Sequence, residues 1–210
     1  MKNEIIDALS WRYATKKYDP QARIPAGDLE TLLESVRMSV SSMGLQPYKV
    51  LVIEDAGLRA ELKAAAYDQD GITSASHLFV FAIDKTGHET QIEDYLHNIS
   101  HTRAISLESL DGFKQSMHKF VGGLGEKRVS WAEKQCYIAL ANLIYSASLL
   151  KIDATPMEGF DRGEFDRILG LPGKGLQTAV IATVGYRHPE DKLQHFKKVR
   201  KSKEELFIHL

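Results

Sequence analysis

The chain has 210 residues, which suits one domain and can bury a sizeable hydrophobic core. Hydrophobic residues make up 43% and charged residues 26%, and the formal net charge is −1, so no strong field favours nucleic acids or membrane surfaces. A lone cysteine excludes an internal disulfide and fits a reducing compartment. The first residues lack the apolar core of a signal peptide, and no stretch reaches the roughly 18 apolar residues of a membrane span. We therefore expect a cytoplasmic protein that binds neither nucleic acid nor membrane.

Apolar residues at helical spacing predict most of the helices. The expected helices cover residues 3–11, 25–39, 57–66 and 131–152. Pro25 stands near the start of the second helix, and Ser130 with Glu133 matches an S-x-x-E capping box before the fourth. Asp161 with Glu164 repeats this signal before a further short helix. The apolar stripe of the second helix consists of Leu29, Leu32, Leu33, Val36 and Val40.

The helix over 131–152 is apolar nearly all round. One stripe consists of Cys136, Leu140, Leu143, Ala147 and Leu150. Its other faces carry Ile138, Ala141, Ile144, Tyr145 and Leu149. Such a helix must be buried on every side, and in a chain this short a second subunit would supply part of the cover. A core helix buried wholly within one chain is the alternative.

Three apolar segments are expected to be strands. They cover residues 48–55, 76–84 and 176–187. The last two are apolar on both faces, which predicts positions in the middle of a sheet. Residues 153–160 form a short extended piece, while 88–127 look helical but polar and irregular. Strands separated by helices, without repeats or a linker, favour one α/β or α+β domain over residues 1–210.

Four basic residues near the two ends of the chain are candidates for an anion site. Arg12 and Lys16 are four apart and would share a face if the first helix included them. Lys198 and Arg200 are two apart and would share one side of an extended segment. Arginine binds phosphate through paired hydrogen bonds, so the two pairs could converge on one phosphate. A solvated basic tail over 187–203 is the alternative.

Several segments resemble motifs of the nitroreductase family, and they occur in the family's order over nearly the whole chain. They are RYATKKYD (12–19), SSMGLQPYKVLVI (41–53), SASHLFVF (74–81), WAEKQCYIALANLIYSASLLKIDATPMEGFD (131–161) and the KVR near the C-terminus. QP or KVR alone carries no weight, whereas the block from 131 to 161 is highly specific. The chain is thus similar to FMN-dependent NAD(P)H nitroreductases and quinone reductases.

This resemblance implies an α+β fold with a central, mostly antiparallel sheet flanked by helices. It also implies an intertwined homodimer with two FMN sites at the subunit interface, toward which the segment of about 187–210 extends. FMN would be tightly bound, and NADH or NADPH would be a transient electron donor. Nitroaromatics, quinones or related acceptors would then be reduced in a ping-pong cycle.

The resemblance also implies which residues contact FMN. It assigns Arg12, Lys16, Lys198 and Arg200 to the phosphate, ribityl chain and pyrimidine edge, with Tyr13 and Ala14 in the same segment. Ser41 and Ser42 would come from the partner subunit, and Gly44 is a further cofactor-binding position. The loop of Pro156, Met157, Glu158 and Gly159 would pass beside the ring, with a backbone N–H near Glu158 facing flavin N5. On its own spacing that loop would be read as a simple turn.

The sequence departs from the family's motifs at several of these positions. Ala14 stands where the family often has Ser, so one hydroxyl contact to the flavin would be missing. Gly44 stands where Asn is common, which puts a second contact in doubt. Tyr48 replaces a frequent Trp, and Gln69 stands where one branch of the family places Gln against the ring. No residue is assigned as an essential general acid or base.

Two other functions are compatible with parts of the sequence. A flavin-binding protein without turnover, used for storage or regulation, is the first. A metal-dependent hydrolase using His97 and His101 is the second, but HNISH lacks the Glu of H-E-x-x-H. GGLG at 122–125 does not complete a phosphate-binding G-x-G-x-x-G. Cys136 lies in the apolar helix and is expected to be a buried hydrophobe.

Overall fold

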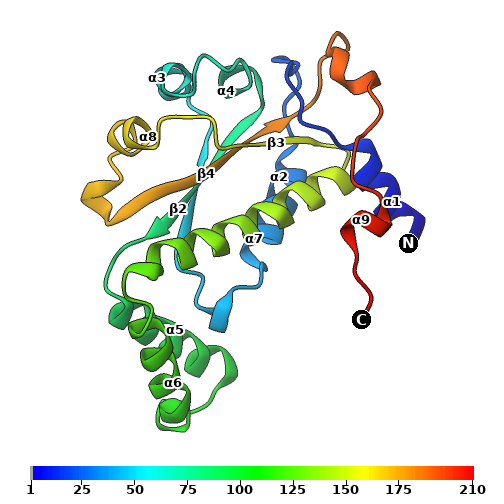
Figure 1. The fold of residues 1–210 in the computed structure, drawn as a ribbon. Coiled ribbons are helices and arrows are strands. Elements are labelled where there is room, and N and C mark those ends of the chain that lie inside the picture. Colours follow the sequence, from blue (N-terminus) through cyan, green and yellow to red (C-terminus); the bar gives the residue numbers. More distant parts are fainter. Residues whose placement is uncertain (1) are drawn as a thin grey trace.

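An antiparallel sheet of four strands forms the centre of the protein, described for residues 2–210 in a computed structural model (Figure 1). The strands are β1 (Tyr48–Ile53), β2 (His77–Asp84), β3 (Asp153–Met157) and β4 (Leu176–Gly185). Their order is β1-β2-β4-β3, so β2 and β4 are central and β3 is an edge strand. The expected α+β fold with an antiparallel sheet is thereby confirmed.

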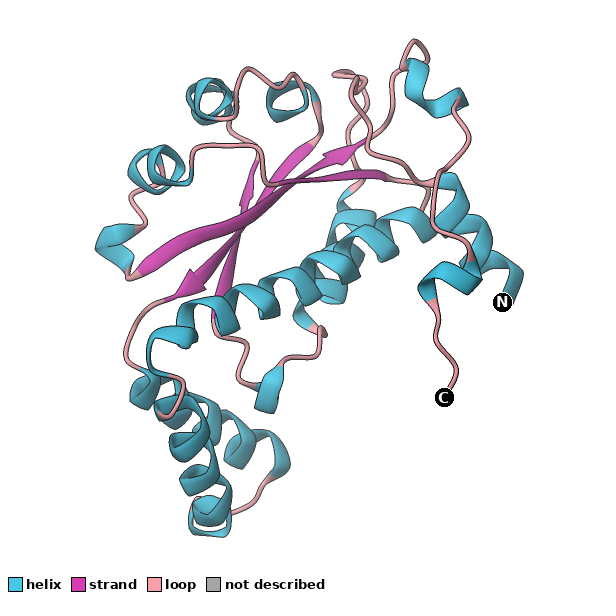
Figure 2. Ribbon diagram, viewed as in Figure 1, coloured by secondary structure: helices cyan, strands magenta, loops and turns pink. Residues whose placement is uncertain are grey.

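Helices pack on both sides of this sheet (Figure 2). They are α1 (Lys2–Trp11), α2 (Ala26–Arg37), α3 (Ala56–Ala65), α4 (Gly71–Ser74), α5 (His88–Arg103), α6 (Asp111–Gly122), α7 (Arg128–Leu149), α8 (Arg162–Ile168) and α9 (Lys203–Leu206). The long helix α7 crosses one side, whereas α3, α4 and α8 lie on the other (Figure 1). Helices α5 and α6 pack together at one end of the molecule.

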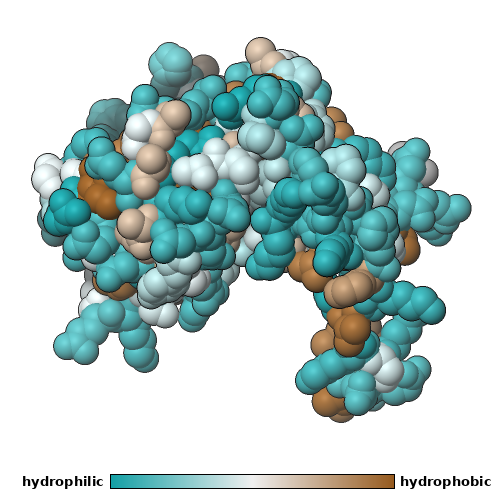
Figure 3. All heavy atoms as spheres, turned by 90° about the horizontal axis from the view of Figure 1, so that it is seen from above, coloured by the Kyte–Doolittle hydropathy of each residue, from teal (hydrophilic) through white to brown (hydrophobic). Residues whose placement is uncertain are grey.

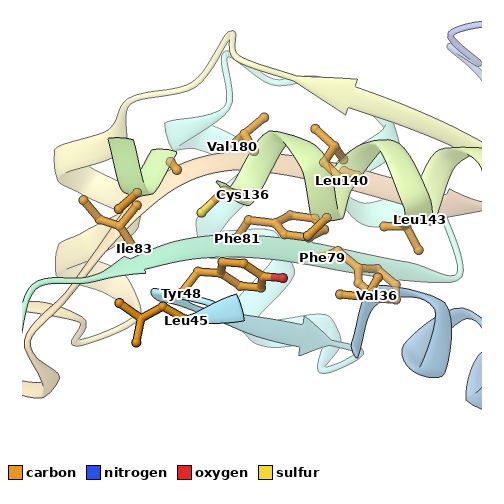
Figure 4. Close-up of a cluster of buried hydrophobic side chains, with 14 of the residues drawn as sticks. Val36, Leu45, Tyr48, Phe79, Phe81, Ile83, Cys136, Leu140, Leu143 and Val180 are labelled. Atoms are coloured by element: carbon orange, nitrogen blue, oxygen red, sulfur yellow. The ribbon is translucent and has the colours of Figure 1, made fainter. Parts of the chain in front are cut away.

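Strand β2 supplies side chains to two separate cores, because successive residues of a strand point to opposite faces. Phe79 and Phe81 pack toward α7 with Leu140, as Figure 4 shows. Leu78 and Val80 point to the opposite face, where Leu62 of α3 and Phe165 of α8 cover them. All four β2 side chains are fully buried, which explains their apolar character on both faces.

Several expected boundaries change in the structure. A 3₁₀ turn at Gly125–Lys127 leads directly into α7, so Ser130 lies inside the helix and makes no cap there. Asp161 does cap α8, accepting a hydrogen bond from the Glu164 amide at 3.0 Å. Val40 lies beyond the end of α2 and is 73% exposed instead of completing its apolar stripe.

The two basic residues at the start of the chain are not on one helical face. Helix α1 ends at Trp11, and residues 12–16 continue without helical structure. The condition for a shared helical face of Arg12 and Lys16 is therefore not met, and any convergence of their side chains depends on how this segment packs. The polar segment 88–127 resolves into α5 and α6, separated by a left-handed residue at Ala104.

Helix α7 has one buried face and one partly exposed face within the single chain. Cys136, Leu140, Leu143 and Ala147 are buried, whereas Leu150, expected in the same stripe, is 36% exposed.

Across the described residues 2–210, no helix combines the length and apolar character that a membrane crossing requires.

The C-terminal segment carries exposed apolar side chains. Val199 and Ile208 are more than 80% exposed, and Phe196, Leu206 and Phe207 are more than half exposed. Figure 3 shows apolar side chains on an arm that stands away from the body, on the side where α9 lies in Figure 1. An exposed apolar arm of this kind is typical of a surface that another protein chain covers.

Candidate functional site

Two segments from opposite ends of the chain enclose one cavity of about 420 Å³. Residues 10–14 with Lys16 form one wall, residues 193–200 form most of the other, and Pro156 of β3 closes it. In Figure 1 the corresponding ends of the chain, near α1 and α9, lie beside each other. Arg12, Lys16, Lys198 and Arg200 all line this cavity, which we call the basic cavity.

The charges in the basic cavity repel one another. Burial lowers the pKa of Arg12, and the neighbouring charge of Arg200 lowers it further. Burial also lowers the pKa of Lys198, followed by the charges of Arg12 and Arg200. Arg12 Nε is buried and makes no hydrogen bond within the described part of the chain. Repelling cations with an unused buried donor favour an anionic ligand, and a phosphate fits this donor set.

Asp191 joins the two walls of the basic cavity. Its carboxylate, which is buried, accepts hydrogen bonds from the backbone amides of Lys16 at 2.7 Å and Lys17 at 3.0 Å. It also accepts one from the Leu193 amide at 3.0 Å. One carboxylate therefore fixes residues 16–17 against the segment that leads to Lys198.

An ion pair between Arg187 and Asp153 anchors the wall formed by the N-terminal segment to the sheet. Arg187 contacts the buried carboxylate of Asp153 on β3 at 2.7 Å. Thr15 donates to that carboxylate at 3.0 Å. The Arg187 guanidinium also lies 4.0 Å from the ring centroid of Trp11 and 4.5 Å from that of Tyr13. Residues 11–15 are thereby held along the edge of β3.

The position of Pro156 decides which main-chain groups face outward from β3. Proline has no N–H, so Thr155 and Met157 must make the ladder bonds to β4. If the Met157 carbonyl points at β4, the next N–H across the planar trans peptide, that of Glu158, points away from the sheet. Arg12 contacts the Ala154 carbonyl, 3.5 Å away, on this same outer edge.

A second cavity of about 430 Å³ adjoins the first at Pro156. We call it the apolar cavity, and its wall is formed by α7, β4 and the end of β3. Its lining residues are Tyr137, Leu140, Ala141, Ile144, Pro156, Met157, Glu158 and Val180. Basic and apolar spaces that share a residue suit a ligand with an anionic end and a flat apolar end.

Gln69 lies next to the loop after β3 and lines neither cavity, so its contact with a flavin ring stays a prediction. Its Nε2 donates to the Gly159 carbonyl at 2.7 Å and to the Ala66 carbonyl at 3.1 Å. Tyr67 and Asp68, directly before it, have positive φ angles of 53° and 56°. The strained turn directs Gln69 toward Gly159.

Ser41, Ser42 and Gly44 do not line the basic cavity. They belong to the loop between α2 and β1, where the Ser42 amide donates to the Gln135 side chain of α7 at 2.9 Å. Gly44 has a φ of +74° and lies against the phenol of Tyr95. Within one chain this loop and the basic cavity are separate, so their meeting at one ligand requires a second subunit and stays a prediction.

The other candidate residues have ordinary surroundings. His97 and His101 are exposed on α5, and the described residues contain no group of three potential metal ligands. Cys136 is buried in α7, where burial raises the pKa of its thiol to about 12. A thiol with this pKa stays protonated and unreactive at neutral pH.

Sequence reasoning missed Tyr137, Asp153, Arg187 and Asp191. Their contacts join residues 21 to 175 positions apart, and no local spacing signals such pairs. A weak signal was present in Asp153, because a carboxylate at the start of a buried strand needs a partner.

Comparison with known proteins agrees with the fold. The profile of the Nitroreductase family matches residues 9–186. A Staphylococcus aureus (strain USA300) protein, provisionally named an NAD(P)H nitroreductase, is 35% identical over 201 residues, covering 90% of this chain and 89% of that protein. A Bacillus subtilis structure provisionally named a nitroreductase has a TM-score of 0.89 at 22% identity, covering 100% of both chains. A structure from Exiguobacterium sibiricum, solved in complex with FMN, has a TM-score of 0.82 at 15% identity, covering 98% and 97%. The chain belongs to the nitroreductase family.

Proposed function

We propose that the protein is an oxidoreductase that binds FMN and uses NADH or NADPH to reduce nitroaromatics, quinones or related acceptors. The observation that carries this proposal is the basic cavity, in which Arg12, Lys198 and Arg200 surround a space next to the apolar cavity. FMN has a matching shape and charge, with a phosphate at one end and a flat ring at the other. The names of the Staphylococcus aureus relative and of the FMN-bound structural neighbour point the same way.

Each part of the site would make a different contact. Arg12, Lys16, Lys198 and Arg200 would hold the phosphate, the ribityl chain and the pyrimidine edge. The ring would lie beside Pro156, and the outward Glu158 N–H would donate to its central nitrogen. Ala14 supplies no hydroxyl, so this segment would contact the cofactor through its backbone and the neighbouring cations.

FMN, when bound, would supply two-electron redox chemistry between a nicotinamide donor and an acceptor. The chain's own residues would bind the cofactor, orient it and exclude water from the site. The apolar cavity is lined mainly by Leu140, Ala141, Ile144 and Val180, which suits flat apolar molecules. Donor and acceptor would use this space in turn, which predicts ping-pong kinetics. Cations near the ring would favour the negative charge that arrives with the hydride.

A homodimer completes the proposed site. The loop with Ser41 and Ser42 is remote from the basic cavity of its own chain and would serve the cavity of the partner. The exposed apolar residues of the C-terminal segment and the half-exposed face of α7 would be covered in this assembly.

An anaerobic absorbance experiment tests this function. Purified protein is reconstituted with FMN, separated from free FMN, and titrated with NADH or NADPH before a quinone or nitroarene is added. The proposal predicts a flavin band that bleaches with a donor and returns with the acceptor. A retained band that neither donor bleaches would indicate a flavin-binding protein without turnover. If wild-type protein retained no FMN, the site assignment would be wrong.

A further inference from the structure

A short hydrogen bond connects α7 to the loop that follows β3. The Tyr137 hydroxyl donates to the Glu158 carboxylate over 2.6 Å. Both residues line the apolar cavity, so the bond lies at the wall of the space proposed for the flavin ring and its substrates. Hydrogen bonds to a carboxylate are among the stronger ones in proteins.

Other contacts hold the same loop from two sides. One turn before Tyr137, Glu133 of α7 pairs with Arg162 at 2.7 Å, so two contacts from one face of α7 reach the chain between Glu158 and Arg162. From the opposite side, Gln69 donates to the Gly159 carbonyl at 2.7 Å. The peptide between Glu158 and Gly159 therefore lies between two anchors.

The loop needs these anchors because the sheet no longer holds it. Strand pairing ends at Met157, and both Glu158 and Gly159 are exposed. Glycine at 159 adds backbone freedom to this point of the chain. Pairing with β4 sets the direction of the Glu158 N–H at its start. Beyond the strand, the side-chain contacts of Glu158 and Gly159 limit its movement, together with a backbone hydrogen bond from the Phe160 amide to the Glu158 carbonyl at 3.0 Å.

We propose that Tyr137 is a positioning residue, which through the Glu158 carboxylate keeps the Glu158 N–H directed at the flavin ring. This inference rests on the proposed function, because it names what holds one donor of that same site. A role as a proton donor to substrate is less suitable. Burial, and next the hydrogen bond to Glu158, raise the pKa of Tyr137 to about 12, so the phenol keeps its proton at neutral pH.

The test uses FMN-loaded protein and a set of matched variants. Tyr137→Phe removes the hydroxyl but keeps the ring, and Glu158→Ala removes the acceptor. Glu158→Gln keeps an acceptor oxygen for Tyr137. Tyr145→Phe, two turns further along α7 and outside both cavities, is the control. The measurements are the visible spectrum of bound FMN, the FMN dissociation constant, the unfolding temperature of the apoprotein, and the rate of flavin bleaching at saturating NADH or NADPH.

A positioning role predicts a specific pattern. Tyr137→Phe and Glu158→Ala each slow bleaching on the order of 10-fold, because a small misplacement of one donor is costly. Both change the absorbance spectrum of bound FMN in the same way, and the double variant is no worse than either. Tyr145→Phe stays close to wild type, Glu158→Gln recovers part of the rate lost in Glu158→Ala, and FMN affinity and apoprotein unfolding change little in all variants.

Two results would overturn the proposal. Tyr137→Phe could match wild type in spectrum and rate, which would show that the hydroxyl positions nothing. Alternatively, it could lower FMN affinity and apoprotein stability with an unchanged spectrum, which would make Tyr137 a purely structural residue. Failure of wild-type protein to bind FMN would instead refute the proposed function.

Discussion

Asp191 shows how one buried carboxylate can organise a binding site without touching the ligand. Burial alone would raise its pKa, but hydrogen bonds from the backbone amides of Lys17, Lys16 and Leu193 outweigh this and lower it. Asp191 is therefore ionised at neutral pH and holds three amide donors. Because those amides belong to both walls of the basic cavity, the position of the cations depends on this charge.

We expect Asp191→Asn to weaken FMN binding about 10-fold or more, since a neutral amide presents an N–H where an acceptor is needed. The dissociation constant can be measured by the quenching of FMN fluorescence. Glu190→Gln is the matched control, because Glu190 is exposed and its carboxylate pairs with Lys17 and His188. Equal FMN affinity in Asp191→Asn and wild type would contradict the role given to Asp191.

His77 predicts a pH dependence of stability. Burial lowers its pKa, the charge of Glu54 opposes this, and the charges of Arg59 and Arg23 lower the pKa further. The folded value is thus below the unfolded value of about 6.5. Below that pH, His77 is protonated in the unfolded chain but stays neutral in the folded chain. The free energy of unfolding therefore falls as the pH decreases from 6.5 toward the folded pKa of His77.

The measurement is urea unfolding at pH 7.5 and at pH 5.5. We expect the unfolding free energy to decrease less between pH 7.5 and pH 5.5 in His77→Gln than in wild type. His97→Gln, at an exposed position on α5, should leave the loss unchanged. An identical loss in wild type and His77→Gln would show that another group carries the pH dependence.

At the scale of elements, the loop between α2 and β1 stores backbone strain. Met43, Gly44 and Gln46 all have positive φ angles, of 57°, 74° and 45°. A Cβ at Gly44 would lie 2.1 Å from the Tyr95 hydroxyl. The small residue that replaces the family's Asn thus makes room for an aromatic side chain from α5.

Gly44→Ala should therefore destabilise the protein by about 1–3 kcal/mol, through both the clash and the unfavourable φ. Combining it with Tyr95→Ala removes the clash, so the double variant should lose less stability than the sum of the two single changes. Urea unfolding of the four proteins gives the required cycle. Strict additivity would mean that Tyr95 and Gly44 do not contact each other in solution.

The sequence predicts those elements whose pattern of apolar residues lies within the element itself. Strand β2 and helix α7 follow directly from apolar residues at their characteristic spacing. The start of α7 was misplaced because a capping pattern at Ser130 cannot reveal that a 3₁₀ turn already precedes it. The four cations of the basic cavity were proposed from their spacing and assigned to FMN by the family resemblance. The pairing of Asp153 with Arg187, in contrast, depends on tertiary packing and leaves no local signal in the sequence.

At the scale of the whole molecule, the exposed C-terminal arm predicts self-association. Leu206, at the end of α9, and Phe207 and Ile208, directly after it, are each more than half exposed. We expect wild-type protein to be a dimer by light scattering after size-exclusion chromatography. A variant truncated after Lys201 keeps Lys198 and Arg200 but lacks residues 202–210, so it should dimerise more weakly than wild type. A monomeric wild type would refute the intertwined assembly.

The basic cavity joins residues near position 12 to residues near position 198, and this separation has a consequence during synthesis. At about 5–20 residues per second, the ribosome needs roughly 10 to 40 s to make the intervening chain. Arg12 therefore emerges long before Lys198 and Arg200 exist. Until they do, a nascent chain offers the cofactor only half of the cations of the basic cavity, so tight cofactor binding waits until Lys198 and Arg200 have been made.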